Sequence, residues 1–423
     1  MHVWRVLRVR GFALLLAGEA INATGSWIAV IAIWGFAAFK FDASAGDLAV
    51  LFIALSIPGA LLGPLLGVPI DRLGPRRALI IANLLGVLNA LALTRADSYR
   101  TIVLLALPLG LIEGMAAAAL DAIPPRLVPD DQLVTANALL AGAQNLAIVV
   151  GPVVAAVVNA QWGLPGAFFV DAGTFLVGAL VAWRIHVPRV VRDVSDHAQN
   201  TWNELRSGLR LARRTAGLRW TLFVAACMYL LWALFGVLEP LYVRDVLGRS
   251  DAVFALLQTV FGIGLVSTGI VLAAVGERVA RPRYVAIAMI VSGATAALYL
   301  GTKSLPVAFV GIFLWGVDTA FFYVPARTLL QRYAPAQYHG RVMALNQSIE
   351  PTAGIIMTPL AAIALGVVSV QTLGLVGGAV ATLAGIVLLR TALRLGPPPP
   401  AGPVDPNAGT ARDAIALGGA APG

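Results

Sequence analysis

Long apolar runs constrain this chain more than any other feature of its sequence. A membrane-spanning helix needs about 20 mostly apolar residues, and about twelve runs of that kind follow one another. They lie near residues 12–37, 48–69, 77–94, 101–123, 136–159, 165–185, 219–241, 252–275, 284–301, 305–326, 344–366 and 370–392. Only 12% of the residues are charged, whereas a soluble domain carries about 25%. The sequence therefore predicts an all-α membrane protein with about 12 transmembrane helices.

The basic residues are distributed unevenly among the gaps between these runs. With the N-terminus placed inside, the gaps on its side hold 24 of the 30 Lys and Arg residues. The opposite gaps hold the other six, which are Lys40, Arg95, Arg100, Arg244, Arg249 and Lys303. Because positively charged loops stay in the cytoplasm, this bias predicts that both termini are cytoplasmic. The charge of +9 forms no patch on one face, which argues against nucleic-acid binding.

Residue types that carry catalysis or bind metals are scarce. The chain has one cysteine, Cys227, and four histidines, so neither a disulfide framework nor a cysteine zinc site can form. No nucleophile with a neighbouring base is recognisable in the sequence. We therefore expect neither an enzyme nor a metal site.

Two segments interrupt the apolar runs. In residues 186–218, apolar side chains recur at helical spacing, and arginines lie off that stripe. This pattern predicts either a basic amphipathic helix on an anionic membrane surface or an ordinary linker helix. Residues 396–423 are rich in Pro, Gly and Ala and are predicted to be disordered. The remaining chain forms two predicted six-helix halves, residues 1–185 and 219–395.

The two halves repeat each other at an offset of roughly 206–209 residues. Pro129 after the fourth run corresponds to Pro335 after the tenth, and Pro152 corresponds to Pro359. Two repeated halves joined by a linker are typical of transporters whose binding site lies between the halves near the membrane midplane.

An ordered motif of glycine, acidic and basic residues follows the second run. Its members are Gly67, Asp71, Arg72, Gly74, Arg76 and Arg77. The motif resembles the signature loop of the major facilitator superfamily. In such a loop the acid can meet a helix N-terminus, and the arginines can pair with acids or with lipid phosphate. The corresponding loop of the second half has no acid that matches Asp71.

Further segments resemble the putative effluxer branch of this superfamily, which includes siderophore exporters of the enterobactin type. They are residues 123–137, Gly151 and Pro152, residues 25–27 and residues 340–342, and the likeness covers residues 10–395. The resemblance implies a monomeric, multi-pass protein of the bacterial plasma (inner) membrane. It also implies a small-molecule substrate, alternating access and a proton gradient as energy source, with no cofactor.

The sequence departs from the antiporter pattern at two places. Gly110 stands where drug–proton antiporters often carry an arginine, and Ala155 and Ala156 stand where two glycines are usual. Gly151 and Pro152 are retained, and we expect them to form a helix-packing and bending site.

Polar or ionisable residues inside the apolar runs are functional candidates, because a charge there costs a few kcal/mol. Glu19 and Asn22 lie three residues apart on one face of the first run, and Glu113 is central in the fourth. Asp318 is central in the tenth run, and Glu350 lies in the inner half of the eleventh. We expect these residues to bind protons or cationic substrate groups, with packing carboxyls as the alternative. By resemblance, runs 1, 4, 7 and 10 line the cavity.

Other charged residues have narrower expected roles. Asp171 and Glu239 lie toward the outer ends of their runs and are expected to cap or pair there. Asp121 and Arg327 are repeat equivalents at the predicted cytoplasmic ends of runs 4 and 10. They predict a gating ion pair that forms when the cavity opens outward, or else Asp121 pairs locally with Arg126.

Export of amphiphilic small molecules of the drug or siderophore type, coupled to protons, is the favoured function. Uptake or facilitated transport of a metabolite remains open, as does a non-transporting sensor or lipid-handling membrane protein. Aromatic residues in the runs predict either a wall for an amphiphilic substrate or packing and lipid contacts; they are Trp34, Trp232, Phe235, Trp315, Phe321 and Phe322.

Overall fold

The computed structural model describes residues 2–188, 197–275, 279–335 and 338–395. The regular elements of this part of the chain are helices. Their bounds are α1 (His2–Leu7), α2 (Arg10–Gly35), η1 (Phe36–Lys40), α3 (Ala45–Leu73), α4 (Pro75–Leu93), α5 (Tyr99–Asp121), α6 (Pro124–Leu127), α7 (Asp130–Arg184), α8 (His197–Arg214), α9 (Ala216–Leu241), η3 (Tyr242–Val246), α10 (Asp251–Val275), α11 (Pro282–Gly301), α12 (Leu305–Tyr333), α13 (His339–Leu365) and α14 (Val370–Ala392).

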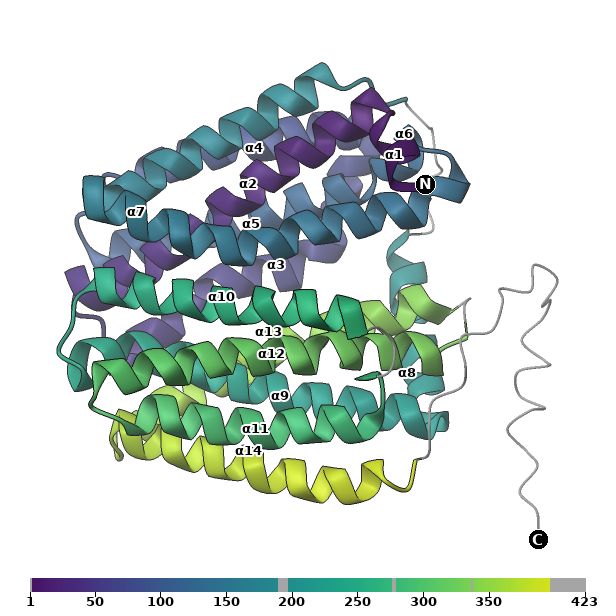
Figure 1. The fold of residues 1–423 in the computed structure, drawn as a ribbon. Helices are drawn as coiled ribbons and strands as arrows, with labels where there is room; N and C mark the ends of the chain where they lie inside the picture. Colours follow the sequence, from purple (N-terminus) through teal and green to yellow (C-terminus); the bar gives the residue numbers. More distant parts are fainter. Residues whose placement is uncertain (1, 189–196, 276–278, 336–337, 396–423) are drawn as a thin grey trace, which may run out of the picture.

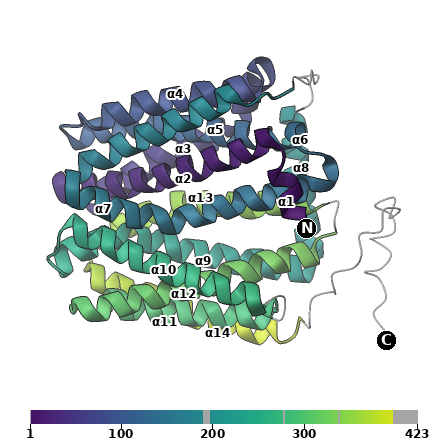
Figure 2. The same cartoon turned by 45° about the horizontal axis from the view of Figure 1, so that its top comes forward.

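The long helices run side by side in two groups. Helices α2–α7 form the N-terminal half, and α9–α14 form the C-terminal half, with the two groups stacked in both views (Figures 1 and 2). Helix α7 packs against α10, and α3 packs against α13, across the boundary between the halves. A cavity at this boundary is therefore bordered by two independently packed groups of helices.

Helix α7 contains two of the predicted spans. Its backbone leaves the helical conformation at Gly163, where φ is 68°. Glycine allows this left-handed turn at little cost. Gly151 and Thr174, which lie almost equally far on either side of Gly163, both contact the same segment of α2. The chain therefore reverses direction at Gly163, and two antiparallel arms replace one long helix.

Eleven helices among the described residues are long and apolar enough to cross a membrane, and α3 adds the shorter apolar stretch Ala45–Pro58. Large apolar side chains stay exposed on the outer helices, among them Leu104, Ile270 and Ile363. Lipid rather than water suits such a surface. The predicted fold class, an all-α membrane protein, is confirmed, whereas the count of twelve spans remains a prediction.

The bundle has two distinguishable ends. Helices α1 and α8 lie at one end, together with the last turn of α14, and we call it the linker end (Figure 1). The opposite, distal end carries η1 and η3. Helix α8 coincides with the predicted amphipathic segment, and it packs against α9 and α13. Its Ala212 is buried there with Leu218 and Val342, so part of its apolar stripe faces protein.

Candidate functional site

A central cavity of about 490 Å³ lies between the two halves. Its lining comes from α2, α3 and α7 of the N-terminal half and from α9, α10 and α13 of the C-terminal half. This set differs from the expectation that runs 1, 4, 7 and 10 line the cavity. Runs 4 and 10, which are α5 and α12, contribute none of its described lining residues. Both pack instead within their own halves, α5 against α3 and α12 against α10.

Aromatic rings from both halves contribute to the wall of the central cavity. Those from the N-terminal half are Trp27, Trp34 and Phe52, and those from the C-terminal half are Tyr229, Trp232, Phe254 and Phe261. The remaining predicted wall residues pack elsewhere. Phe235 and Phe322 are buried, and Trp315 packs edge-on against Phe235 with ring centroids 5.1 Å apart. Phe321 packs edge-on against Tyr284. The aromatic prediction therefore holds for Trp34 and Trp232 only.

Two carboxyl groups reach the central cavity, both from the C-terminal half. Glu239 is 8% exposed, and its Oε2 accepts a hydrogen bond of 2.8 Å from Gln258 Nε2. The Glu239 carboxyl also interacts with the Tyr299 hydroxyl of α11. Glu350 is exposed and lines the same cavity. Glu239 was expected to cap or pair locally, so its contribution to the cavity is a finding of the tertiary structure.

A second, smaller cavity of about 100 Å³ lies inside the N-terminal half, and we call it the N-terminal cavity. Its polar lining residues are Glu19, Asn22, Asn83, Glu113 and Gln144. The predicted candidates Glu19, Asn22 and Glu113 thus lie together, although they come from two different helices. Asn83 on α4 and Gln144 on α7 complete the set, and neither residue stands out in the sequence.

Hydrogen bonds fix the two glutamates of the N-terminal cavity. Glu19 Oε1 accepts a bond of 3.0 Å from Gln144 Nε2, and Glu113 Oε1 accepts one of 3.0 Å from Ser26 Oγ. The Glu113 carboxyl is close enough to interact electrostatically with Glu19 and with Asp171. Asp171 is 1% exposed, and both of its oxygens lack a partner in the described structure. A predicted capping residue is thus a buried neighbour of the acidic cluster.

Asp318 lies apart from both cavities. It is 3% exposed and accepts a hydrogen bond from the Ser292 hydroxyl of α11. Its second oxygen has no partner in the described structure. Asp318 thus packs toward α11, as the alternative of a packing carboxyl expects, and its role in binding protons or cationic groups stays a prediction.

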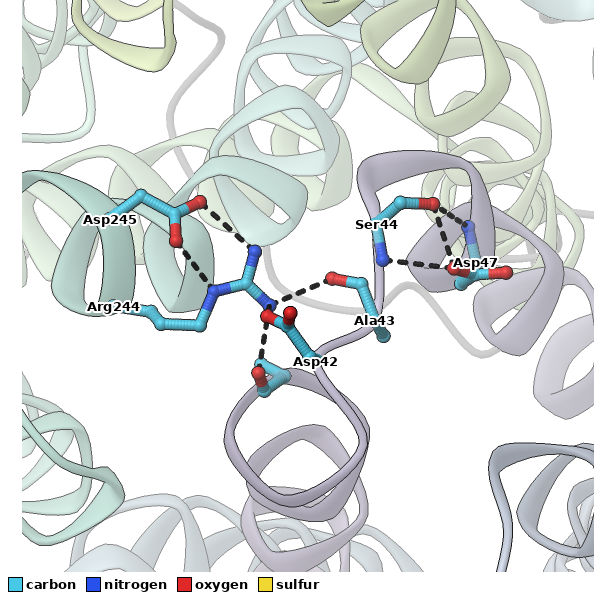
Figure 3. Close-up of polar contacts among 7 residues, drawn as sticks. Asp42, Ala43, Ser44, Asp47, Arg244 and Asp245 are labelled. Atoms are coloured by element: carbon cyan, nitrogen blue, oxygen red, sulfur yellow. Dashed lines mark hydrogen bonds and ion pairs between the residues drawn. The ribbon is translucent and has the colours of Figure 1, made fainter.

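The distal end holds an arginine that joins the halves, and we call this group of contacts the distal clamp (Figure 3). Arg244 Nη1 lies 3.0 Å from Asp42 Oδ1 and donates hydrogen bonds to the carbonyl oxygens of Ala38 (2.8 Å) and Ala43 (2.9 Å). Asp245 binds the other edge of the guanidinium at 2.6 and 3.0 Å. In the sequence, Arg244 is only one of six basic residues on its side of the membrane.

The internal repeat explains the geometry of the distal clamp. Each half ends its first long helix in a π-helical turn, η1 in one half and η3 in the other. Each turn is followed by a residue in the left-handed conformation, Asp42 (φ 49°) and Gly248 (φ 60°). Arg244 and Ala38 hold equivalent places in these turns. The clamp therefore joins equivalent turns of the two halves.

A second polar contact supports the distal clamp. Asn159 Nδ2 of α7 donates a hydrogen bond of 2.9 Å to Asp251 Oδ2 at the start of α10. Nearby, the Phe39 and Phe254 rings pack with centroids 6.0 Å apart. Phe254 also lines the central cavity, so these contacts close the cavity on its distal side.

The predicted gating ion pair between Asp121 and Arg327 is not formed in the described structure. Among the residues that the structure describes, Asp121 and Arg327 form no ion pair with each other, and Asp121 forms none with Arg126. Asp121 is exposed, and Arg327 interacts electrostatically with Tyr229 of α9. A pair that forms only in an outward-open state remains a prediction.

The signature loop is described in part. Residues Gly67, Asp71 and Arg72 belong to α3, but their side chains lie outside the described part of the structure. Gly74 has φ 82° and separates α3 from α4. Arg76 Nε donates a hydrogen bond of 3.0 Å to Ala182 O, and Arg76 also donates to Trp183 O. Arg76 therefore caps the C-terminal end of α7, where carbonyl groups lack helical partners.

Removal of this cap is expected to destabilise the N-terminal half. Arg76→Ala should lower the free energy of unfolding by about 1–2 kcal/mol, because two carbonyl bonds to a charged group are lost. The thermal unfolding midpoint of the purified protein measures the effect. Arg77→Ala is the matched control, since the Arg77 side chain is exposed. Equal midpoints for the two variants would contradict the capping role.

Gly151 and Pro152 lie where α7 meets α2. Gly151 packs so closely against Trp27 that a Cβ atom at position 151 would lie only 2.4 Å from the Trp27 Cβ atom. Pro152 lines the central cavity. The pair therefore borders the cavity as well as a helix contact.

The family model described as Major Facilitator Superfamily matches residues 15–248 and 221–419. The chain belongs to the major facilitator superfamily. Membership identifies it as a multi-pass membrane transporter of small molecules. The resemblance seen in the signature loop is thereby confirmed.

Relatives in this superfamily include efflux proteins. The chain is 24% identical over 366 residues to "Macrolide efflux protein A" of Streptococcus pyogenes, which covers 84% of this chain and 90% of the relative. It is 22% identical over 394 residues to "Uncharacterized MFS-type transporter YfiS" of Bacillus subtilis (strain 168), with 90% and 93% covered. A segment of 149 residues is 31% identical to "Multidrug resistance protein MdtG" of Salmonella typhimurium, with 33% and 36% covered.

Solved superfamily structures share the fold at low sequence identity. A peptide transporter POT has a TM-score of 0.70 at 13% identity, with 94% of this chain and 99% of that chain covered. A bacterial homologue of the lysosomal transporter Spinster, in an inward-facing and unoccupied conformation, has a TM-score of 0.65 at 14% identity, with 91% and 96% covered. At these identities the likeness shows the fold alone.

Proposed function

We propose that this protein is a secondary active transporter that exports amphiphilic small molecules by alternating access. The observation that carries the proposal is the central cavity, which both halves line and the distal clamp closes on one side. Its volume of about 490 Å³ lies within the range of about 300–1,000 Å³ that is usual for small-molecule sites. The relatives named as macrolide and multidrug efflux proteins favour export over uptake.

The lining favours amphiphilic substrates with a cationic group. Trp27, Trp34 and Trp232 offer aromatic faces, which attract both apolar rings and cations. Glu239 and Glu350 supply negative charge, and the described lining contains no Lys or Arg.

Coupling to protons is assigned to the N-terminal cavity. Glu19 and Glu113 interact there in a buried setting, where carboxyl groups commonly serve proton relays. The gradient then supplies about 2.3 kcal/mol per charge per 100 mV, so no cofactor is needed.

The orientation in the membrane follows from the distribution of basic residues. The described parts of the gaps that are rich in Lys and Arg lie at the linker end, and we assign this end to the cytoplasm of a bacterial inner membrane. With the distal end closed, the structure then corresponds to an inward-facing state. One chain supplies the whole cavity, which supports a monomer.

The test is substrate-driven proton release from inside-out vesicles, with lipophilic cations, macrolides and catecholate siderophores as the panel. Wild-type protein should give a signal, and Glu113→Gln should lose it while substrate binding persists. Glu239→Gln should weaken substrate binding by about tenfold, because a desolvated charge contact worth about 1.4 kcal/mol is lost.

If no compound of the panel caused proton release, with protein insertion verified, this result would contradict the proposed export. It would favour a carrier of a narrow range of metabolites or a non-transporting protein. A full proton signal in Glu113→Gln would remove Glu113 from the coupling mechanism but leave export intact.

A further inference from the structure

The N-terminal cavity directs oxygen atoms toward its interior. Asn83 is 2% exposed, its Nδ2 donates to Leu79 O at 2.8 Å, and its Oδ1 is buried without a partner in the described structure. Asn22 is 9% exposed, and its Oδ1 is likewise unpartnered. Gln144 Nε2 is already used by Glu19. Asn22 and Asn83 therefore each bring an unpartnered amide oxygen to the lining of the cavity.

Burying polar oxygens without hydrogen-bond partners or counter-ions lowers the stability of the folded protein. A buried polar oxygen without a partner costs about 1–3 kcal/mol, and buried carboxylates need a nearby cation or a proton. The residues that line the cavity include no Lys, Arg or His. Glu19 interacts electrostatically with Asp121, and Glu113 interacts with Asp171. These charged neighbours are also acidic. Helix α4 contributes Asn83 but no charged lining residue.

The carboxylate and amide oxygens of the N-terminal cavity indicate which type of ion it would bind. Hard cations prefer carboxylate and amide oxygens. No group of three or more His, Cys, Asp or Glu side chains in the described structure could hold a metal ion, which argues against a calcium or zinc site. Two glutamates, one of them protonated, with two amide oxygens suit a single positive charge. The cavity of about 100 Å³ has room for such an ion with about two waters, since one water occupies about 30 Å³.

We propose that the N-terminal cavity binds Na⁺ in competition with the proton, at a site formed by Glu19, Glu113, Asn22 and Asn83. The inference rests on the proposed coupling role of this cavity and names a second ion for it. Na⁺ occupies the site when one glutamate is ionised and the other is protonated, and protonation of the ionised glutamate expels it. The central cavity shares no lining residue with this site, so ion and substrate bind at separate places.

Equilibrium binding of ²²Na⁺ to the purified protein tests the proposal. At about pH 8.5, far above the ordinary pKa of a glutamate, binding should be saturable and displaced by unlabelled NaCl. Choline chloride should hold the ionic strength without competing, because choline is too large for the cavity. Acidification to about pH 5.5 should weaken binding by about tenfold or more, since proton and Na⁺ share the carboxylates.

The variants separate this site from the central cavity. Glu113→Gln, which keeps the side-chain shape, and Asn83→Ala should each weaken ²²Na⁺ binding by about tenfold, equal to 1.4 kcal/mol. Glu350→Gln is the matched control and should bind Na⁺ as the wild type does. Absence of saturable binding in the wild type, or its loss only in Glu350→Gln, would overturn the proposal. Substrate-driven proton release that persists without Na⁺ binding would overturn the sodium site and leave the proposed export standing.

Discussion

Gly110→Ala is expected to destabilise the protein strongly, although it adds only one methyl group. A Cβ atom at Gly110 would lie 2.2 Å from the carbonyl oxygen of Leu55, where α5 crosses α3. The obstructing atom belongs to a helix backbone, so no side-chain rotation relieves the clash. The helices must separate, and we expect a loss of at least about 1–3 kcal/mol, the usual cost of overpacking.

Thermal unfolding of purified Gly110→Ala measures this effect. Gly173→Ala is the matched control, because a Cβ atom there meets nothing within 4 Å and the residue also lies in a helix. Gly316→Ala should behave like Gly110→Ala, since its Cβ would lie 2.1 Å from the carbonyl oxygen of Phe261. An unfolding midpoint of Gly110→Ala equal to that of Gly173→Ala would show that α3 and α5 do not cross so closely.

The same crossing explains a departure from the antiporter pattern. Gly110 occupies the place where drug–proton antiporters often carry an arginine, and the Leu55 carbonyl leaves no room for any side chain. Gly316 and Phe261 form the equivalent crossing in the C-terminal half, so the close approach belongs to the repeat. A coupling mechanism in this protein therefore cannot use a basic residue at position 110, which agrees with the role proposed for the glutamates of the N-terminal cavity.

Arg244→Gln is expected to shift the protein toward a distal-open conformation. The arginine joins the halves through two backbone carbonyls and Asp42, and its side chain is only 20% exposed. Hydrogen bonds to a charged group contribute about 1.5–3 kcal/mol each, so their loss should change the closed-to-open ratio by about tenfold or more. Asp42→Asn should have little effect, because the Asp42 side chain is 90% exposed and exposed ion pairs contribute about 0–1 kcal/mol.

Spin labels across the distal end report this shift. Ala160→Cys and Ala252→Cys introduce exposed positions beside the Asn159–Asp251 contact, in a Cys227→Ser background. The distance distribution should lengthen in Arg244→Gln and stay close to that of the parent in Asp42→Asn. Equal distributions for all three proteins would show that the distal clamp does not hold the closed state.

Part of the candidate site could be predicted from the sequence. Glu19, Asn22 and Glu113 stood out because polar groups inside apolar runs are costly, and the structure brings them into one cavity. Asn83 and Gln144 did not stand out, since placing a neutral amide in a membrane helix costs less free energy than placing a charged group there. The sequence did not reveal that Glu239 lines the central cavity or that Asp318 packs toward α11, because distance along a run does not show which helix a residue faces.

By itself, the sequence determined the fold class, the repeat of two halves and the family, since these follow from the spacing of apolar runs and from one ordered loop motif. Only the tertiary structure decided which helices line the central cavity. It also decided that Arg244 joins the halves and that Gly110 lies where two helices cross. The physical reason is that any sufficiently long apolar run is stable as a helix in lipid, whichever helices lie next to it and however it is rotated about its axis. Rotation and neighbours are set by side-chain packing and by bonds between residues far apart in the chain.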